Sequence, residues 1–241
     1  MRRRFSIRRW AVWMILPAIA VAACDQASES PLQPDEIQIN AKNGTNSGVP
    51  VLSFADLSEV GTSYLKRTPN GVNYRLKTTG LEPGDAYTLW IVIFNDTDGC
   101  LDGTPGFSLC GPNDVVNDGA KPDMMYAGGH IVGGSGKATF AGRRRAGDPS
   151  GSANDPVGLP AYGLYNPSGA EFHLVVHHHG PRLPEYMPDM IKTIDGGCTD
   201  TGVPAEGVPS PWNLYAGPPQ GAFGRRGPNT CQSVQFAVHS P

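Results

Sequence analysis

The sequence predicts an all-β fold, an antiparallel β-sandwich of about seven to nine strands with long, disulfide-stapled loops. Its 31 glycines and 23 prolines leave few windows in which a long helix could form. Turns rich in these two residues separate short segments that alternate apolar and polar residues or are apolar throughout. Four cysteines lie in or beside the longest connections, where they can staple the loops.

The first 36 residues are not expected to belong to the sandwich. Residues 1–23 combine five arginines with an apolar stretch shorter than the about 20 residues that a bilayer span requires. They lead into the sequence VAAC, which resembles the lipobox of bacterial lipoproteins. That resemblance implies that Cys24 is lipidated and becomes the mature N-terminus. Residues 24–36 would then be a polar tether and residues 37–241 a single sandwich domain. The alternative is an ordinary secretory signal cleaved near Ala23.

Removal of the leader changes the charge of the chain. Residues 1–23 contain five arginines and no acidic residue, so the mature chain keeps 14 Lys and Arg against 22 Asp and Glu, a net charge of −8. This balance argues against nucleic acid or an anionic lipid surface as a partner. The resemblance to lipoproteins implies a chain exported to the periplasmic or extracellular side of a bacterial membrane. The lipid on Cys24 would make the membrane its partner.

The expected strands follow one another along the whole domain. Two of them show the pattern most clearly. In residues 71–80, every second residue from Val72 to Thr78 falls on one face, which is typical of a half-buried strand. Residues 86–95 are apolar on both faces, which indicates a central strand whose outer face is also covered. The expected strands are residues 36–40, 51–57, 61–68, 71–80, 86–95, 124–133, 136–142, 170–179 and 231–239.

Residues 80–92, GLEPGDAYTLWIV, resemble the turn and strand of fibronectin type III and other Ig-like domains. The resemblance implies an Ig-like sandwich in which Tyr87 forms a tyrosine corner. The same turn is similar to one in copper/zinc superoxide dismutase, but the metal-binding histidines of that enzyme are replaced here by Leu89 and Ile91. Residues 71–241 also resemble a group of uncharacterised exported bacterial proteins, which implies export and fold but no activity.

The four cysteines beyond Cys24 are expected to form two disulfides, for which three pairings exist. Proximity along the chain favours Cys100 with Cys110 and Cys198 with Cys231. Loop closure of this size stabilises a fold by about 3 and about 4 kcal/mol. The absence of a Cys-x-x-Cys pair from the sequence argues against a structural zinc site.

Residues 171–180, EFHLVVHHHG, hold four of the six histidines. Alternation assigns Phe172, Leu174, Val176 and His178 to the core face, and His173, His177 and His179 to the outward face. Strand residues two apart are about 6.6 Å apart and residues four apart about 13 Å. Only His177 and His179 could therefore share a metal ion.

A third ligand for that pair would come from His239, which is expected on the non-core face of its strand, or from His130. Glu171 is a poorer candidate. Such a histidine cluster suits copper or zinc. The alternative is a histidine-rich outer face that the loop of residues 180–230 partly covers.

Asp96, Asp98 and Asp102 form a pattern that resembles the calcium loops of EF-hands and thrombospondin type 3 repeats. Carboxylate oxygens at such spacing can surround a Ca²⁺ ion. The position of the bidentate glutamate of an EF-hand is occupied by Phe107, however. The alternative is a polar turn closed by a disulfide.

No catalytic motif was recognised. Ser135 lies in VGGSGK, which has neither the spacing of a nucleophile elbow nor that of a phosphate-binding loop, and these glycines are expected to form a hairpin turn. The sequence therefore favours a non-catalytic, membrane-anchored binding or accessory protein, with a partner in a membrane complex. The alternative function is metal binding by the histidine cluster.

Overall fold

The computed structural model describes residues 46–154, 159–199 and 224–241. These residues fall within the compact unit of residues 40–241. The strands are β1 (Asn46–Ser53), β2 (Glu59–Thr68), β3 (Gly71–Thr78), β4 (Asp85–Phe94), β5 (Pro122–Ile131), β6 (Ala138–Arg145), β7 (Glu171–Pro181) and β8 (Gln232–His239). The short helices are η1 (Thr97–Gly99), η2 (Pro112–Val116), η3 (Asp118–Ala120), η5 (Pro184–Tyr186) and α1 (Met187–Met190).

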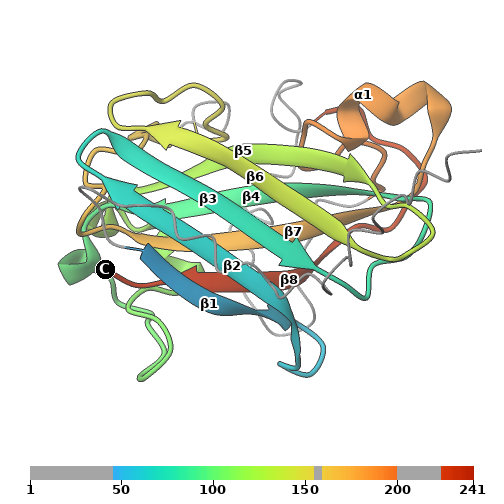
Figure 1. Cartoon of the computed structure of the whole chain (residues 1–241). Helices are drawn as coiled ribbons and strands as arrows, with labels where there is room; N and C mark the ends of the chain where they lie inside the picture. Colours follow the sequence, from blue (N-terminus) through green and yellow to red (C-terminus); the bar gives the residue numbers. More distant parts are fainter. Residues whose placement is uncertain (1–45, 155–158, 200–223) are drawn as a thin grey trace, which may run out of the picture. The chain divides into compact units, whose positions relative to one another are not determined.

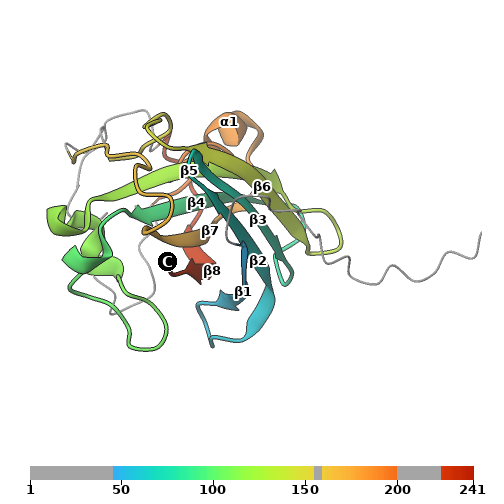
Figure 2. The same ribbon diagram turned by 60° about the vertical axis from the view of Figure 1, so that its left-hand side comes forward.

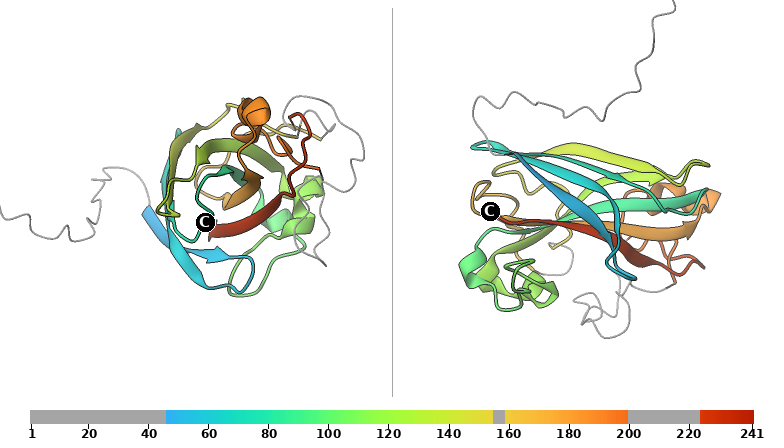
Figure 3. Two further views of the ribbon diagram at one scale, coloured as in Figure 1. Left: turned by 90° about the vertical axis from the view of Figure 1, so that its right-hand side faces the viewer. Right: turned by 60° about the horizontal axis from the view of Figure 1, so that its bottom comes forward.

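The eight strands form one antiparallel sheet in the order β5-β4-β7-β8-β1-β2-β3-β6 (Figure 1). The sheet curls until its two edge strands, β5 and β6, lie side by side, so that it is nearly closed and barrel-like (Figures 2 and 3). The hydroxyl of Tyr74 on β3 crosses this seam and donates a hydrogen bond of 2.7 Å to the carbonyl of Ala127 on β5.

The prediction of an all-β antiparallel fold is confirmed, and the division into two facing sheets is not. Both predicted disulfides, Cys100–Cys110 and Cys198–Cys231, are present. The expected strand of residues 36–40, like the leader and the tether, lies outside the described residues.

The predicted hairpin between residues 124–133 and 136–142 is wrong. β6 pairs with β3 and β5 pairs with β4, so the connection between β5 and β6 joins the two edges of the sheet. Its backbone bonds instead to the turn before β4. Leu81 donates its N–H to the carbonyl of Gly136, and Gly84 donates its N–H to that of Val132.

Apolar side chains fill the space inside the curled sheet. Alternate residues of β3, β4 and β7 point inward, among them Leu76, Ile91 and Leu174, as the alternation predicted. The other face of β4 is also buried, because loops cover it, and a second apolar cluster forms there around Trp90 and Phe94. The interpretation of residues 86–95 as a strand buried on both faces is therefore confirmed.

Tyr87 lies in the inner cluster beside the turn that precedes β4. Its hydroxyl accepts a hydrogen bond of 2.9 Å from the backbone N–H of Glu82, which is the contact expected of a tyrosine corner. The ring stacks on His178 with 4.6 Å between centroids. Burial raises the pKa of Tyr87 to about 12, so the hydroxyl stays protonated.

Glu171, the first residue of β7, carries a fully buried carboxylate. It accepts hydrogen bonds of 2.9 Å from the backbone N–H groups of Leu109 and Cys110, and bonds of 2.8 Å from His173 and Ser240. Burial alone would raise the pKa of this carboxyl, but the bonds from His173, Leu109 and Cys110 lower it to about 2. One side chain thus ties the loop after β4 and the C-terminal segment to β7.

Replacing Glu171 by Gln should cost roughly 2–3 kcal/mol of unfolding free energy at neutral pH, because an amide cannot satisfy these donors as a carboxylate does. The pKa is about 2 in the folded chain and near 4.5 in the unfolded chain. The carboxylate therefore contributes its full stability above about pH 4.5 and loses it as the pH falls towards about 2. Urea unfolding across this range would show a weaker acid dependence for Glu171→Gln. The exposed Glu59→Gln is the control, and an equal loss in both variants would contradict the role assigned to Glu171.

Candidate functional site

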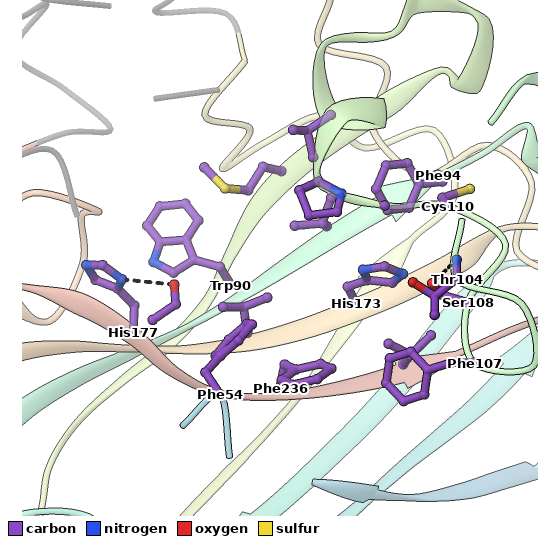
Figure 4. Close-up of a pocket in the computed structure, with 18 of the residues that line it drawn as sticks. Phe54, Trp90, Phe94, Thr104, Phe107, Ser108, Cys110, His173, His177 and Phe236 are labelled. Atoms are coloured by element: carbon purple, nitrogen blue, oxygen red, sulfur yellow. Dashed lines mark hydrogen bonds between the residues drawn. The ribbon is translucent and has the colours of Figure 1, made fainter. Parts of the chain in front are cut away.

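A pocket of about 240 Å³ lies on the outer face of β4, β7 and β8, beneath the loop that joins β4 to β5 (Figure 4). Its floor comes from outward-pointing residues of the three strands: Trp90, Val92, Phe94, His173, Val175, His177, Ser233, Phe236 and Val238. Its roof comes from the loop residues Thr104, Phe107, Ser108, Cys110, Gly111, Pro112 and Val115. Phe54, Met124 and Ile194 complete the wall.

The mouth of the pocket is aromatic. The rings of Phe54 and Phe236 stack with 4.4 Å between centroids, and Phe107 meets Phe236 edge-on at 5.7 Å. Phe54 and Phe107 remain 41% and 43% exposed, respectively. An incoming apolar group would therefore meet solvent-facing rings before it reaches the buried floor.

The roof is held in one conformation by a disulfide and two carboxylates. Cys100–Cys110 closes the loop, and Glu171 anchors it to β7. The carboxylate of Asp114 accepts backbone N–H bonds of 2.8–3.0 Å from Leu101, Asp102 and Gly111. Because these bonds all come from within the chain, the protein itself holds the loop over the pocket, and in this sense the pocket is preformed.

His177 is the most deeply buried polar residue of the floor. Its Nδ1 lies 3.4 Å from the hydroxyl of Ser233, and its Nε2 has no hydrogen-bond partner among the described residues. Burial, with the neighbouring His179 and His178, lowers the pKa of His177 well below 6.5. The ring is therefore neutral at physiological pH and keeps a lone pair on one nitrogen.

His179 has partners for both ring nitrogens. The carbonyl of Gly196 can only accept, so Nδ1 carries the proton and donates across 2.9 Å. Nε2 then accepts from the hydroxyl of Thr88 at 2.8 Å, and Thr88 accepts from the indole N–H of Trp90 at 2.9 Å. Burial lowers the pKa of His179 to about 4.

His177 and His179 lie beside the disulfide between Cys198 and Cys231. Their ring centroids are 4.9 Å apart, and one ligand atom from each of His177, His179, Cys198 and Cys231 lies within 4.8 Å of the other three. All four residues are buried. The four could bind a metal ion, but the two cysteines are joined as a disulfide. The segment around Gly196 and Cys198 also covers this outer face, as the alternative interpretation of the histidine strand expected.

The two proposed third ligands lie elsewhere. His239 pairs with Phe172 across β7 and β8, points into the sheet interior and bonds to Ser63 at 2.8 Å, so the prediction that it faces outward is wrong. His130, on β5, pairs with Tyr87 and contacts the ring of Phe140. Neither belongs to a group of metal ligands within the described residues.

His239 faces inward, although the alternation of β8 predicts the opposite, for a physical reason. Alternation predicts that the apolar Val234, Phe236 and Val238 face the core and that His239 faces outward, but Phe236 and Val238 line the outer pocket. Both faces of β8 are covered, so apolar character does not distinguish them. The polar Gln235 shares the inward row of Ala237 and His239, where its side chain accepts a hydrogen bond from Thr78.

The three aspartates of the calcium-loop pattern do not come together either. Asp96, Asp98 and Asp102 do not form a ligand group in the described part of the chain. Asp102 instead accepts the backbone N–H of Asn113. The ligand group found in this loop comprises Cys100, Cys110 and Asp114, whose cysteines are bonded to each other.

Comparison of the chain with family models, with curated proteins and with solved structures gave no significant match. Within the described residues, no helix has the length and hydrophobicity needed to cross a membrane. Cys24 and its tether lie outside these residues.

The buried histidines should make the fold sensitive to mild acid. The pKa values of His179 and His239 are about 4 in the folded chain, chiefly because of burial, and near 6.5 in the unfolded chain. The stability that the fold gains from keeping these two histidines neutral is complete above about pH 6.5 and is lost as the pH falls towards about 4. At about pH 5 each histidine should lower the free energy of unfolding by roughly 2 kcal/mol relative to neutral pH. Urea unfolding at neutral pH and at about pH 5 would measure the loss. His239→Gln should reduce it, and an unchanged pH dependence in that variant would refute the assignment.

Proposed function

We propose that the protein is an extracytoplasmic binding protein, anchored to a bacterial membrane by a lipid on Cys24, that binds an apolar ligand in the outer pocket. The observation that carries this proposal is the preformed pocket of about 240 Å³ with an aromatic mouth. Apolar cavities with a few polar groups are the usual binding sites for small molecules. The resemblance of VAAC to a lipobox supports the anchor.

The lining defines the class of ligand. The floor offers Trp90, Phe94 and Phe236, and the polar atoms are mainly hydroxyls and imidazoles such as those of Ser108 and His173. A cavity of about 150 Å³ accepts a single benzene ring. The pocket is about one and a half times that size and therefore suits a neutral molecule of about two rings, or a short apolar chain, with one polar group.

The proposal includes no catalytic step. The described lining residues include no Asp, Glu, Lys or Arg, so a paired-carboxylate mechanism has no groups facing the pocket. His173 lines it, but its Nε2 is bonded to the carboxylate of Glu171, which anchors the roof. A place in a membrane complex and a relationship with Ig-like domains are further parts of the proposal. The first is supported by the lipobox, the second by the tyrosine-corner bond of Tyr87.

Val175→Trp should fill the pocket from its floor and weaken binding of the neutral two-ring fluorescent dye 2-naphthol by more than about tenfold. A fluorescence titration of the dye would measure this loss. Thr139→Trp, on the exposed face of β6, is the matched control and should bind as the parent does. Equal affinity of both variants for the dye would locate binding outside the pocket and refute the assignment.

Cys24→Ser should abolish lipid attachment in a bacterial host, because a hydroxyl cannot be thioether-modified. The variant should move from the membrane fraction to the soluble extracytoplasmic fraction and should lose incorporation of labelled palmitate. Membrane retention with unchanged labelling would rule out Cys24 as the anchor.

Metal binding is the second candidate function, favoured by the convergence of His177, His179, Cys198 and Cys231. Imidazole and sulfur donors suit zinc or copper. In the disulfide form, however, the sulfurs are not thiolates and both nitrogens of His179 are engaged.

A further inference from the structure

We propose that the Cys198–Cys231 disulfide gates a Cys₂His₂ zinc site, which forms with His177 and His179 when a dithiol reductant opens the bond. This inference rests on the second candidate function, metal binding, and adds its regulation. Its test uses Zn²⁺ alone and requires no ligand in the outer pocket, which His177 also lines.

The backbone holds the two cysteines together without help from their disulfide. Cys198 and Asn229 form a parallel bridge, in which the N–H groups of Thr199 and Asn229 bond to the carbonyls of Asn229 and Gly197 at 2.7 and 2.9 Å. The side chain of Asn229 also donates to the carbonyls of His179 and Pro181 at 2.8 and 2.7 Å. These bonds connect the cysteine segments to β7, so the four side chains should stay close after reduction.

His177 supplies an independent observation. Its Nε2 is buried and has no hydrogen-bond partner among the described residues. An unpaired buried polar atom costs about 1–3 kcal/mol. The neutral ring keeps one lone pair, which a metal ion beside this ring and the edge-on ring of His179 would use.

The distance between His179 and Cys198 fits zinc. Nδ1 lies 3.6 Å from the sulfur. Bonds of about 2.1 Å to nitrogen and about 2.3 Å to sulfur at the tetrahedral angle imply a separation of about 3.6 Å between the two donor atoms. To bind metal through Nδ1, His179 must release Gly196 and carry its proton on Nε2. Thr88 can accept that proton's hydrogen bond, because a hydroxyl oxygen has two lone pairs.

Charge explains why the disulfide acts as a gate. A zinc ion held only by neutral imidazoles would place two uncompensated positive charges in a buried site, which is costly. Two thiolates neutralise them. The reductant gives up two electrons and becomes a disulfide, the S–S bond breaks, and each sulfur takes a proton. Zinc then displaces both thiol protons to solvent.

The test uses the full, untagged chain with Zn²⁺ as the probe. The protein is reduced anaerobically with dithiothreitol, desalted and titrated with Zn²⁺, and bound metal is counted by mass spectrometry. The reduced chain should bind one Zn²⁺, and the oxidised chain should bind it more than about tenfold more weakly. With Co²⁺ the reduced chain should show a thiolate charge-transfer band and tetrahedral ligand-field bands.

Matched variants identify the ligands. Cys198→Ser/Cys231→Ser should lose the site, and His177→Ala should weaken it by more than about tenfold. Cys100→Ser/Cys110→Ser removes the other disulfide and should keep it. Cys231→Ser leaves a Cys198 thiol beside both histidines and should bind Zn²⁺ without reductant. This variant and circular dichroism separate a lost site from a lost fold.

The possible outcomes distinguish control of the site by the disulfide from zinc binding itself. Equal zinc affinity in oxidised and reduced chains, both weakened by His177→Ala, would overturn the gate and leave metal binding intact. Failure of folded, reduced protein and of folded Cys231→Ser to bind Zn²⁺ would overturn both. Unchanged binding in His177→Ala would overturn the proposed ligand set.

Discussion

The attachment of the pocket roof to β7 depends on one buried negative charge, that of Glu171. The carboxylate of Glu171 lies at the start of β7 and accepts hydrogen bonds from residues that are distant in sequence. Leu109 and Cys110 lie 62 and 61 positions earlier, and Ser240 lies 69 positions later. An ionised group in such a place is tolerated only when its hydrogen-bonding capacity is met. Because the donors include the consecutive backbone N–H groups of Leu109 and Cys110, the charge also fixes the end of the disulfide loop. The cavity beneath that loop is a consequence of this constraint.

The site lies outside the curled sheet because the inside is full. Large side chains such as Tyr87, Leu89 and Phe172 occupy the interior, leaving the polar His239 and Arg67 at one end. The outer face of β4 is also apolar and that of β7 carries histidines, yet irregular loops cover both, and loops pack less regularly than a strand face does. The histidines of β7 accordingly divide between two environments. His173 borders the pocket, whereas His179 is enclosed by Thr88 and Gly196.

Local patterns in the sequence were sufficient for the strands. The alternation of residues 71–80, the two-faced strand at residues 86–95, the disulfide pairing and the hydrogen bond of Tyr87 all depend on near neighbours, and the structure confirms them. The errors concern partners that are distant in sequence. The inward position of His239 cannot be read from β8 alone, because the distant loop around Phe107 covers the apolar outer face of that strand, and the pairing of β6 with β3 reflects closure of the sheet. The Asp114 and Glu171 anchors could not be recognised either, because a carboxylate in a loop or at a strand end has no local signature.

The seam between β5 and β6 has a consequence for the chain in a crowded compartment. Edge strands expose backbone groups that can recruit strands from other molecules. Here each edge shields part of the other, and residues 151–153 bond to β5 at Met124 and Tyr126. β6 ends in three consecutive arginines, Arg143–Arg145, whose charges oppose the approach of a second sheet. The curled sheet thus protects itself from edge-to-edge aggregation without the backbone ladder that would complete its closure.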